Sequence, residues 1–318
     1  MWYQQGRIYW LLLPLSALYW LLSALRRALF RYGLKRQIKL PVPVIVVGNI
    51  SVGGTGKTPF TLLLADLLRQ QGWRPGIISR GYGARITQPV LVSKTSDARQ
   101  VGDEPLLLAQ TSDCPVVVCP DRVAAAQHLL ANSDCNIIIS DDGLQHYRLA
   151  RDIEIVLLDG HRGLGNGHLL PAGPLREGIW RLGQVDLVVA NSAASALADG
   201  VMLLQPTAAQ SLISKALLSP CAVSLVAGIG NPQRFENTVR TAGFSIQGRH
   251  YFTDHHQFIA ADFDAIPGPV LMTEKDAVKC RPFAQPDWYS LAVQAKPDTA
   301  IMTKLSTILT NLRSSYGA

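Results

Sequence analysis

A glycine-rich segment followed by lysine and threonine could bind phosphate groups. The apolar run Val44–Val47 leads into SVGGTGKT at Ser51–Thr58, and an apolar helical pattern follows. In this order of strand, loop and helix, backbone amides and the positive helix end converge on phosphate oxygens. Lys57 is expected to reach the β- and γ-phosphates, and the Thr58 hydroxyl to ligate Mg²⁺. The segment therefore predicts a phosphate loop for ATP and magnesium.

The loop departs from the usual GxxxxGK[ST] pattern at one position. Ser51 stands where the pattern has glycine, and Gly53 and Gly54 are expected to supply the lost flexibility two residues later. We expect the whole loop to border the nucleotide: Ser51, Val52, Gly53, Gly54, Thr55, Gly56, Lys57 and Thr58.

Carboxylates at strand ends are candidates for the magnesium ligand. NIIISDDG puts Asp141 and Asp142 after one apolar run, and IEIVLLDG puts Asp159 after another. A carboxylate in that position can hold a metal that bridges the phosphates. Because adjacent carboxylates repel each other unless a cation is close, the pattern favours Asp141 and Asp142. Asp159 is the alternative, or a turn-capping residue, and either member of the pair could contact the metal directly.

Phosphoryl transfer also needs a group that accepts the proton of the attacking hydroxyl. VGDEP offers Asp103 and Glu104 at an expected helix start, and YFTDHHQF offers Asp254, His255 and His256. An Asp–His pair can hold a pKa near the working pH. Spacing alone is weak evidence, since an isolated GDEP is more often a helix start with Asp103 as its N-cap.

Short apolar runs that alternate with helical patterns must position these groups. Thr58–Gln71 and Arg122–Ala131 are expected to be helices. Such alternation is typical of an α/β fold with a mainly parallel sheet, helices on both faces and ligands at the carboxyl ends of the strands. The expected strands are Val44–Val47, Gly76–Ser79, Val116–Cys119, Asn136–Ser140, Ile153–Leu158 and Asp186–Ala190.

A looser stretch rich in Ala and Ser, Ser192–Ser219, precedes a second group of elements. That group contains expected strands at Val223–Ile229 and Gly268–Met272 and an expected helix at Pro232–Gly243. We therefore expect three parts. They are a membrane-associated helix with a basic flank over residues 1–39, a P-loop NTPase-type core over 40–215, and a smaller C-terminal α/β subdomain over 216–318.

The N-terminal segment combines an apolar run with most of the excess positive charge. Ile8–Leu25 has eighteen residues without a charge, near the minimum for a membrane span. Eight basic residues and no acidic residue precede Asp66, so 22 basic and 23 acidic residues remain of the totals of 30 and 23. This pattern favours anionic lipid and a cytoplasmic position over nucleic acid. Trp10, Tyr19 and Trp20 could anchor at the lipid interface; spanning and in-plane insertion both stay open.

A series of short segments runs in order over almost the whole chain, and together they resemble the tetraacyldisaccharide 4′-kinase (lipid A 4′-kinase) family of Gram-negative bacteria. Each segment alone is weak evidence, whereas the ordered set is specific. The segments are the apolar N-terminal helix, VPVIVVGNISVGGTGKTP, SRGYG, VGDEP, DDGLQH, PAGPLRE, VAGIGNP, DHH and TEKDAVK.

The resemblance implies an ATP-dependent kinase that phosphorylates the 4′-hydroxyl of tetraacyldisaccharide 1-phosphate, an acylated glucosamine disaccharide, to give lipid IVA. It implies that the enzyme acts on the cytoplasmic face of the inner membrane. It also implies a P-loop domain joined through a hinge to a smaller α/β subdomain. We expect no obligate protein partner.

The resemblance also suggests roles for individual residues. Asp103 resembles the catalytic base, paired with His255, and His256 stays possible as its partner. The metal-side carboxylates would be Glu104 and Asp142.

Two further motifs have less certain roles. Arg176 and Glu177 of PLRE resemble residues that line the catalytic cleft. Arg80 of SRGYG could contact the anionic head group, or SRGYG could be a simple glycine turn. TEKDAVK could lie near the adenine, or could be a helix start capped by Thr273.

A membrane-associated P-loop switch NTPase is the alternative function. It would explain the phosphate loop and the basic helix, but it leaves the DHH and PLRE segments unexplained. It predicts nucleotide turnover without a lipid acceptor.

Overall fold

The central strands of the larger sheet, from β7 to β4, are short, apolar and buried, as a parallel sheet with two covered faces requires. The computed structural model describes Trp2 and residues 7–316, so residues 1, 3–6, 317 and 318 of the expected terminal parts lie outside the described residues. The sheet order is β15-β8-β7-β6-β1-β5-β2-β4-β3, parallel from β8 to β4 and antiparallel at both edges. Its strands are β1 (Val44–Gly48), β2 (Pro75–Ser79), β3 (Val90–Val92), β4 (Val116–Val118), β5 (Ile137–Asp141), β6 (Ile153–Asp159), β7 (Leu187–Asn191), β8 (Gly200–Pro206) and β15 (Val293–Pro297).

The six strands expected in the core are all present, and their ends shift by no more than one residue. The fold class is therefore confirmed as α/β with a mainly parallel P-loop sheet. Helices cover it: α2 (Lys57–Gln70), α3 (Ala98–Val101), α4 (Asp103–Thr111), α5 (Arg122–Ala131), the 3-10 helix η2 (Ile179–Gln184) and α8 (Thr299–Tyr316).

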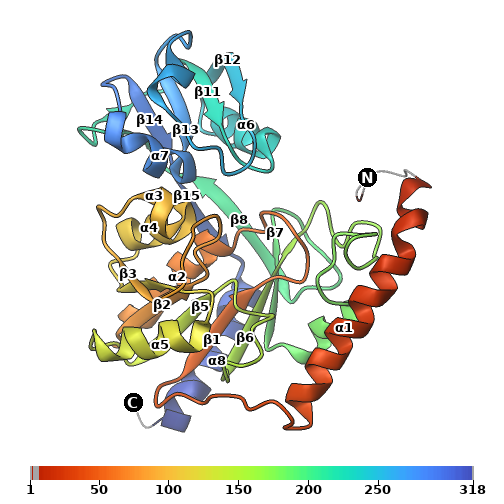
Figure 1. Cartoon of the computed structure of the whole chain (residues 1–318). Helices are drawn as coiled ribbons and strands as arrows, with labels where there is room; N and C mark the ends of the chain where they lie inside the picture. The colour runs from red at the N-terminus through yellow and green to blue at the C-terminus, as the bar shows by residue number, and fades with distance from the viewer. Residues whose placement is uncertain (1, 3–6, 317–318) are drawn as a thin grey trace.

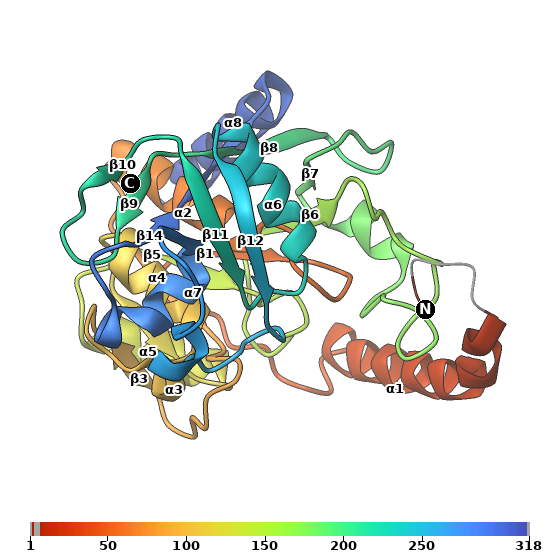
Figure 2. The same ribbon diagram turned by 90° about the horizontal axis from the view of Figure 1, so that it is seen from above.

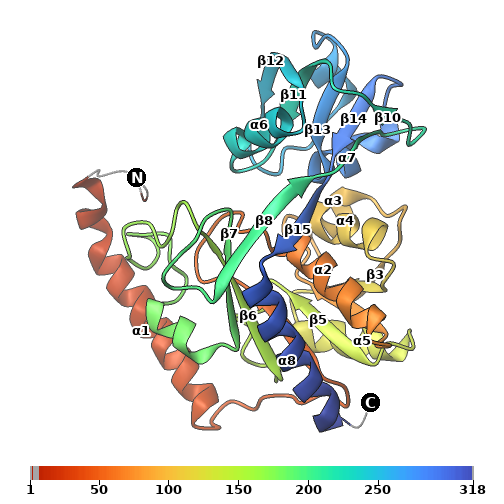
Figure 3. The same cartoon turned by 180° about the vertical axis from the view of Figure 1, so that it is seen from behind.

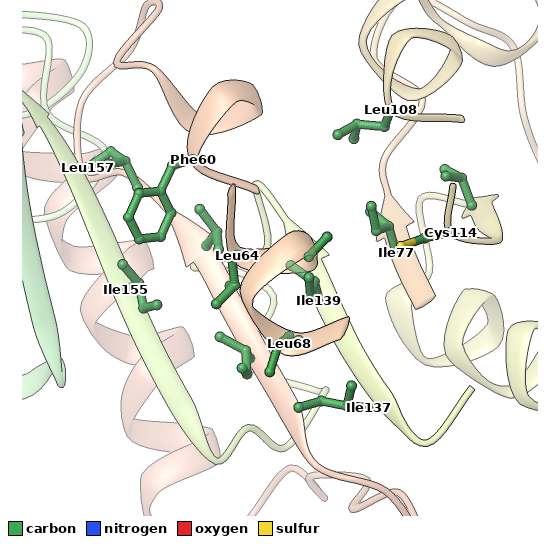
Figure 4. Close-up of a cluster of buried hydrophobic side chains, with 14 of the residues drawn as sticks. Phe60, Leu64, Leu68, Ile77, Leu108, Cys114, Ile137, Ile139, Ile155 and Leu157 are labelled. Carbon is green, nitrogen blue, oxygen red and sulfur yellow. The ribbon is translucent and has the colours of Figure 1, made fainter. Parts of the chain in front are cut away.

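Apolar residues four apart fix α2 on the sheet. Phe60, Leu64 and Leu68 are each fully buried, because this spacing puts them on one helix face. They pack on Ile155, Leu157 and neighbouring strand residues (Figure 4). This contact holds the first turn of α2 at the carboxyl end of β1.

A second, six-stranded sheet forms the smaller lobe above the larger one (Figure 1). Its order is β10-β9-β14-β13-β11-β12. Its strands are β9 (Ala209–Ser211), β10 (Leu217–Leu218), β11 (Ala222–Ala227), β12 (Ser245–Tyr251), β13 (Val270–Thr273) and β14 (Trp288–Leu291), and its helices are α6 (Pro232–Thr241), η3 (Ala260–Phe263), α7 (Glu274–Cys280) and η4 (Arg281–Phe283).

The chain enters the smaller lobe through β8 and returns through β15, which pair antiparallel and run side by side between the lobes (Figure 3). The structure therefore divides the chain differently from the expected ranges 40–215 and 216–318. β9 already belongs to the smaller sheet, whereas β15 and α8 complete the larger lobe. β8 is half-exposed although it pairs on both sides, and β15 is the half-exposed edge strand, so both carry a weaker apolar signal than the buried strands.

The N-terminal helix lies along the outer side of the larger lobe (Figures 1 and 2). It consists of the 3-10 turn η1 (Arg7–Leu12) and α1 (Leu13–Arg31). Tyr9–Arg31 is long and apolar enough to cross a membrane. Ser16 is its one buried residue among those described, so most of the apolar surface of α1 faces outward.

We predict that Leu305→Ala destabilises the larger lobe. Leu305 on α8 is 1% exposed and packs in the same cluster as Phe60. Loss of such a side chain typically costs about 2–5 kcal/mol through the cavity that remains. Hydrogen exchange followed by mass spectrometry should show faster exchange in β1 and α2 than in the wild type, with β11 and β13 unchanged.

Ser306→Ala, on the exposed side of α8, is the matched control and should leave exchange unaltered. Faster exchange confined to the smaller lobe in the Leu305 variant would contradict the assignment of α8.

Candidate active site between the two lobes

The glycine-rich loop has the backbone geometry that a phosphate site needs. Gly53 and Gly56 have φ values of +105° and +90°, which favour glycine. A Cβ on Gly56 would also lie 2.4 Å from Asn191 Nδ2. No side chain of the described residues caps the N-terminus of α2. Its first amides are therefore directed toward the loop, where an anion can bind them.

The environment of Ser51 explains its departure from the consensus. Ser51 is buried and forms an isolated bridge with Leu175, so its backbone is paired with a neighbouring loop. The left-handed turns occur at Gly53 and Gly56 instead. Position 51 thus does not need glycine, in line with the expectation that the later glycines supply the flexibility.

Side chains from three elements brace the loop. Asn49 Nδ2 donates to Gly53 O and to Thr55 Oγ1, both at 3.4 Å. Asn191 at the end of β7 donates to Thr55 O at 2.9 Å, and Gln145 donates to Asn49 O at 3.1 Å. The loop is held in shape by the protein itself before any ligand binds.

The adjacent carboxylates at the end of β5 lie in opposite electrostatic environments. Burial, together with nearby Glu104, raises the pKa of Asp141 to about 7. Burial also acts to raise the pKa of Asp142, but the cations of Lys57 and Arg176 lower it to about 2. Asp142 lies 3.5 Å from Lys57 Nζ and 3.2 Å from Arg176 Nη1. Asp142 is therefore already paired with two cations, whereas burial dominates the environment of Asp141.

The oxygen donors here suit a hard cation. Thr61 donates to Asp141 Oδ1 at 3.3 Å, while Asp141 Oδ2 is buried without a hydrogen-bond partner among the described residues. Those residues hold no group of three or more His, Cys, Asp or Glu side chains close enough for a metal. Mg²⁺ is commonly held by one or two carboxylates plus substrate phosphates. Asp141 with Thr58 at the start of α2 fits that pattern.

Asp159, the alternative ligand, has other partners. Its carboxylate accepts from the backbone amides of His161 and Arg162 at 3.1 and 3.0 Å. It also lies 3.6 Å from Arg234 Nη1, on the smaller lobe. These contacts fit the turn-capping reading of Asp159.

Asp103 is paired with a histidine from the other lobe. It is buried at the first residue of α4, and its Oδ2 lies 3.0 Å from His255 Nδ1. Lys275 Nζ and Lys279 Nζ on α7 each lie 3.9 Å from the same oxygen. Burial acts to raise the pKa of Asp103, but His255 and the two lysines outweigh it and lower this pKa. Asp103 is thus kept as a carboxylate.

The two adjacent histidines have different surroundings. The hydrogen bond with Asp103 raises the pKa of His255, and its ring lies 5.1 Å from that of Tyr82. His256 instead contacts Asp262 at 3.0 Å and stacks on Phe252. Of the two partners left open by the sequence, the contacts of the structure select His255.

Glu104 connects the Asp103 pair to the phosphate loop. Its charge contributes to the raised pKa of Asp141, so α4 and the end of β5 face the same space. Its own carboxylate accepts from Lys275 at 3.0 Å. Lys275 belongs to TEKDAVK, which therefore lies beside Asp103 and Glu104, with Thr273 capping the helix as one of the two readings expected.

Arg176 and Glu177 are neighbours with different environments. Arg176 extends toward Asp142, as described above. Glu177 is 2% exposed. It accepts from Gln145 Nε2 at 3.0 Å and from the Tyr147 hydroxyl. Its side chain therefore does not line an open cleft, contrary to expectation, because it is used to join two loops.

Two cationic groups were missed by the sequence analysis. Arg122 is buried and donates to Asp142 O at 3.2 Å, and burial lowers its pKa to about 10. The charge of exposed Arg80, after β2, adds to this effect. The second group is Lys275 and Lys279. The available signals were a basic residue at the start of α5 and lysines four apart on a helix.

A cavity of about 310 Å³ lies beside the phosphate loop between the lobes. Arg234 of α6 lines it and also donates to Gly54 O at 3.5 Å. Leu204 and Pro206 of β8 add an apolar wall. The site thus consists of an anion-binding loop, a carboxylate cluster and an Asp–His pair, with a cavity alongside.

Known proteins share this arrangement over nearly the whole chain. The family model described as tetraacyldisaccharide-1-P 4′-kinase matches residues 8–310. A tetraacyldisaccharide 4′-kinase of Shewanella amazonensis is 49% identical over 96% of this chain and 93% of its own. One from Shewanella sp. strain MR-7 is 52% identical over 93% of this chain and 90% of its own.

A solved structure is also similar. The "apo" form of LpxK from Aquifex aeolicus in complex with ATP superposes with a TM-score of 0.80 at 28% identity, covering 96% of this chain and 99% of that one. The family model matches most of the chain and the relatives are about half identical to it, so the chain belongs to the tetraacyldisaccharide 4′-kinase family.

Proposed function

We propose that this kinase transfers the γ-phosphate of ATP to the 4′-hydroxyl of tetraacyldisaccharide 1-phosphate, giving lipid IVA, with Asp103 as the proton acceptor. The bond between Asp103 and His255 carries the proposal. It joins the two lobes beside the phosphate loop, where an acceptor hydroxyl would meet a bound nucleotide.

The phosphate loop supports binding of the ATP triphosphate. Amides of residues 53–58 and the N-terminus of α2 would bind the β- and γ-phosphates. Lys57, now 3.5 Å from Asp142, would turn to the γ-phosphate with little movement. The cavity beside Gly54 has room and an apolar wall for the nucleoside.

Asp141 and Thr58 would hold Mg²⁺, and Asp142 and Glu104 would complete the negative environment around it. Bound there, the ion neutralises charge on the phosphates of the nucleotide. Because burial raises the pKa of Asp141 to about 7, a cation beside it would favour its ionised form.

Asp103 would receive the proton in the transfer step. The 4′-oxygen attacks the γ-phosphorus, the bond from that phosphorus to the β,γ-bridging oxygen breaks, and the 4′-hydroxyl proton passes to Asp103. His255 fixes the orientation of the carboxylate, and Lys275 and Lys279 keep it ionised. Arg122, Arg176 and Lys57 supply the positive charge that a diffuse phosphoryl transition state needs.

The outer face of α1 supports a position on the cytoplasmic face of the inner membrane. Exposed apolar side chains recur along α1 and the preceding turn: Trp10 and Leu11 on η1, and Leu15, Leu18, Trp20, Leu21, Leu22 and Leu25 on α1. The opposite face contacts the protein from Ser16 to Phe30. A helix bound to its own protein along its length is suited to lying in the membrane plane. Basic residues from Arg26 to Lys39 would face anionic head groups.

We expect purified protein with Mg-ATP to phosphorylate tetraacyldisaccharide 1-phosphate, and Lys57→Ala to abolish the labelling. Asp103→Asn should lower kcat by about 10²- to 10⁴-fold with little change in the Kd for ATP. Asp134→Asn, 84% exposed at its side chain, is the control and should behave as the wild type.

ATP hydrolysis by the wild type without any labelled lipid would instead favour the switch NTPase. Equal loss of turnover and ATP binding in the Asp103 variant would assign Asp103 to nucleotide binding.

The pairing of His255 predicts a pH dependence. Its pKa is raised above 6.5 in the folded protein, so the stabilisation from its charge is complete below about pH 6.5 and is lost as the pH rises through the raised pKa. In an NMR titration, Asp103→Asn should lower the pKa of His255. Asp254→Asn, 3.9 Å from His255 Nε2, should lower it less, and the reverse order would refute the pairing.

The exposed face of α1 predicts vesicle binding. Leu22→Glu should strongly reduce flotation with vesicles that contain anionic phospholipid, because the change puts a charge among apolar side chains. Leu217→Glu, on β10 and 66% exposed, should float like the wild type. Unchanged flotation of the Leu22→Glu variant would show that α1 is not the membrane contact.

A further inference from the structure

The loop that carries Arg176 is held directly by the N-terminal helix. We define residues 169–178, between β6 and η2, as the arginine loop. Ser16 Oγ donates to Leu169 O at 2.8 Å, and the Tyr19 hydroxyl donates to Arg176 O at 3.0 Å. The helix thus contacts both ends of the arginine loop, one of them at the arginine itself.

The same loop is bonded on its other side to the phosphate loop. Arg176 N donates to Ile50 O at 2.7 Å, and Val52 N donates to Pro174 O at 2.9 Å. The guanidinium of Arg176 lies 3.2 Å from Asp142. The arginine loop is therefore a layer between α1 and the phosphate loop, and its position depends on both.

Tyr19 lies at the point where the two faces of α1 meet. Its neighbours Leu18 and Trp20 are 51% and 52% exposed, whereas its own hydroxyl is directed toward the protein. The pKa of the hydroxyl is raised by its burial and by Glu177, which fits a hydroxyl used as a donor. A hydroxyl is not needed for lipid contact by the ring, so the bond to the arginine loop gives it a separate role.

We propose that Tyr19 is a positioning residue that makes the position of the Arg176 guanidinium depend on how α1 lies on the bilayer. The inference rests on the proposed function, in which α1 binds the membrane and Arg176 acts on the transferred phosphoryl group. A shift of α1 moves the carbonyl of Arg176 through one hydrogen bond. Ser16 holds the far end of the arginine loop, whereas Tyr19 is bonded to the residue that carries the guanidinium.

Tyr19→Phe tests this role because it keeps the ring and removes only the hydroxyl. On vesicles, kcat for lipid phosphorylation should fall roughly 2- to 10-fold, as expected for one lost hydrogen bond, while the KM for ATP and vesicle flotation stay unchanged. Ser23→Ala is the matched control, because the Ser23 hydroxyl donates to Trp20 O within its own helix. It should keep the kcat of the wild type.

Hydrogen exchange gives a readout that does not depend on turnover. Addition of vesicles should slow exchange at residues 169–178 in the wild type and in Ser23→Ala, but not in Tyr19→Phe. The same slowing in all three proteins, or an unchanged kcat in Tyr19→Phe, would overturn the proposal.

Arg176→Ala separates this failure from failure of the proposed function. If Arg176→Ala loses most of its kcat while Tyr19→Phe has the kcat and the hydrogen exchange of the wild type, only the positioning role of Tyr19 is refuted. If Arg176→Ala keeps the full kcat, Arg176 has no role in the reaction, and the positioning role of Tyr19 is refuted as well.

Discussion

The buried carboxylate of Asp103 is the constraint on which the rest of the site depends. A charge in that position is costly unless cations and hydrogen bonds compensate for it. All three of its cationic neighbours, His255, Lys275 and Lys279, come from the smaller lobe. The larger lobe contributes the carboxylate and the smaller lobe makes its ionised form stable, so the reactive arrangement exists only when the lobes are together.

The same dependence explains why the lobes are joined by two strands. β8 and β15 pair antiparallel from Met202 to Pro206, so the smaller lobe is fixed at both of its ends. Two paired strands can bend as a unit but resist twisting apart. They hold α7 at the N-terminus of α4.

The sequence was sufficient to predict the core of the larger lobe and its phosphate loop. Its central strands are buried on both faces and so form continuous apolar runs. The GKT residues lie in the glycine-rich loop that follows the first of these strands. The course of the chain beyond residue 200 was harder to predict, because β8 and the edge strand β15 have mixed polarity and are only partly buried. Nothing in the local pattern indicates that the chain returns to the larger sheet after the smaller lobe.

The site shows the same division between local and distant information. Asp141 and Asp142 follow a strand and could be found from local pattern. Asp103 and His255 are 152 positions apart, so spacing could not pair them, and only the family resemblance did. The different environments of Asp141 and Asp142 depend on Arg176 from a third segment. Arg122 carried no signal beyond its place after a strand.

The return of the chain through β15 and α8 has a consequence for the order of synthesis. The smaller lobe is an insertion between β8 and β15, so its residues are made before the larger sheet has its last edge strand. Residues 299–316, which bury Leu305 and Leu309 against the larger lobe, leave the ribosome later still, whereas α1 emerges at the start. A nascent chain therefore exposes α1 while the larger lobe still lacks its last helix.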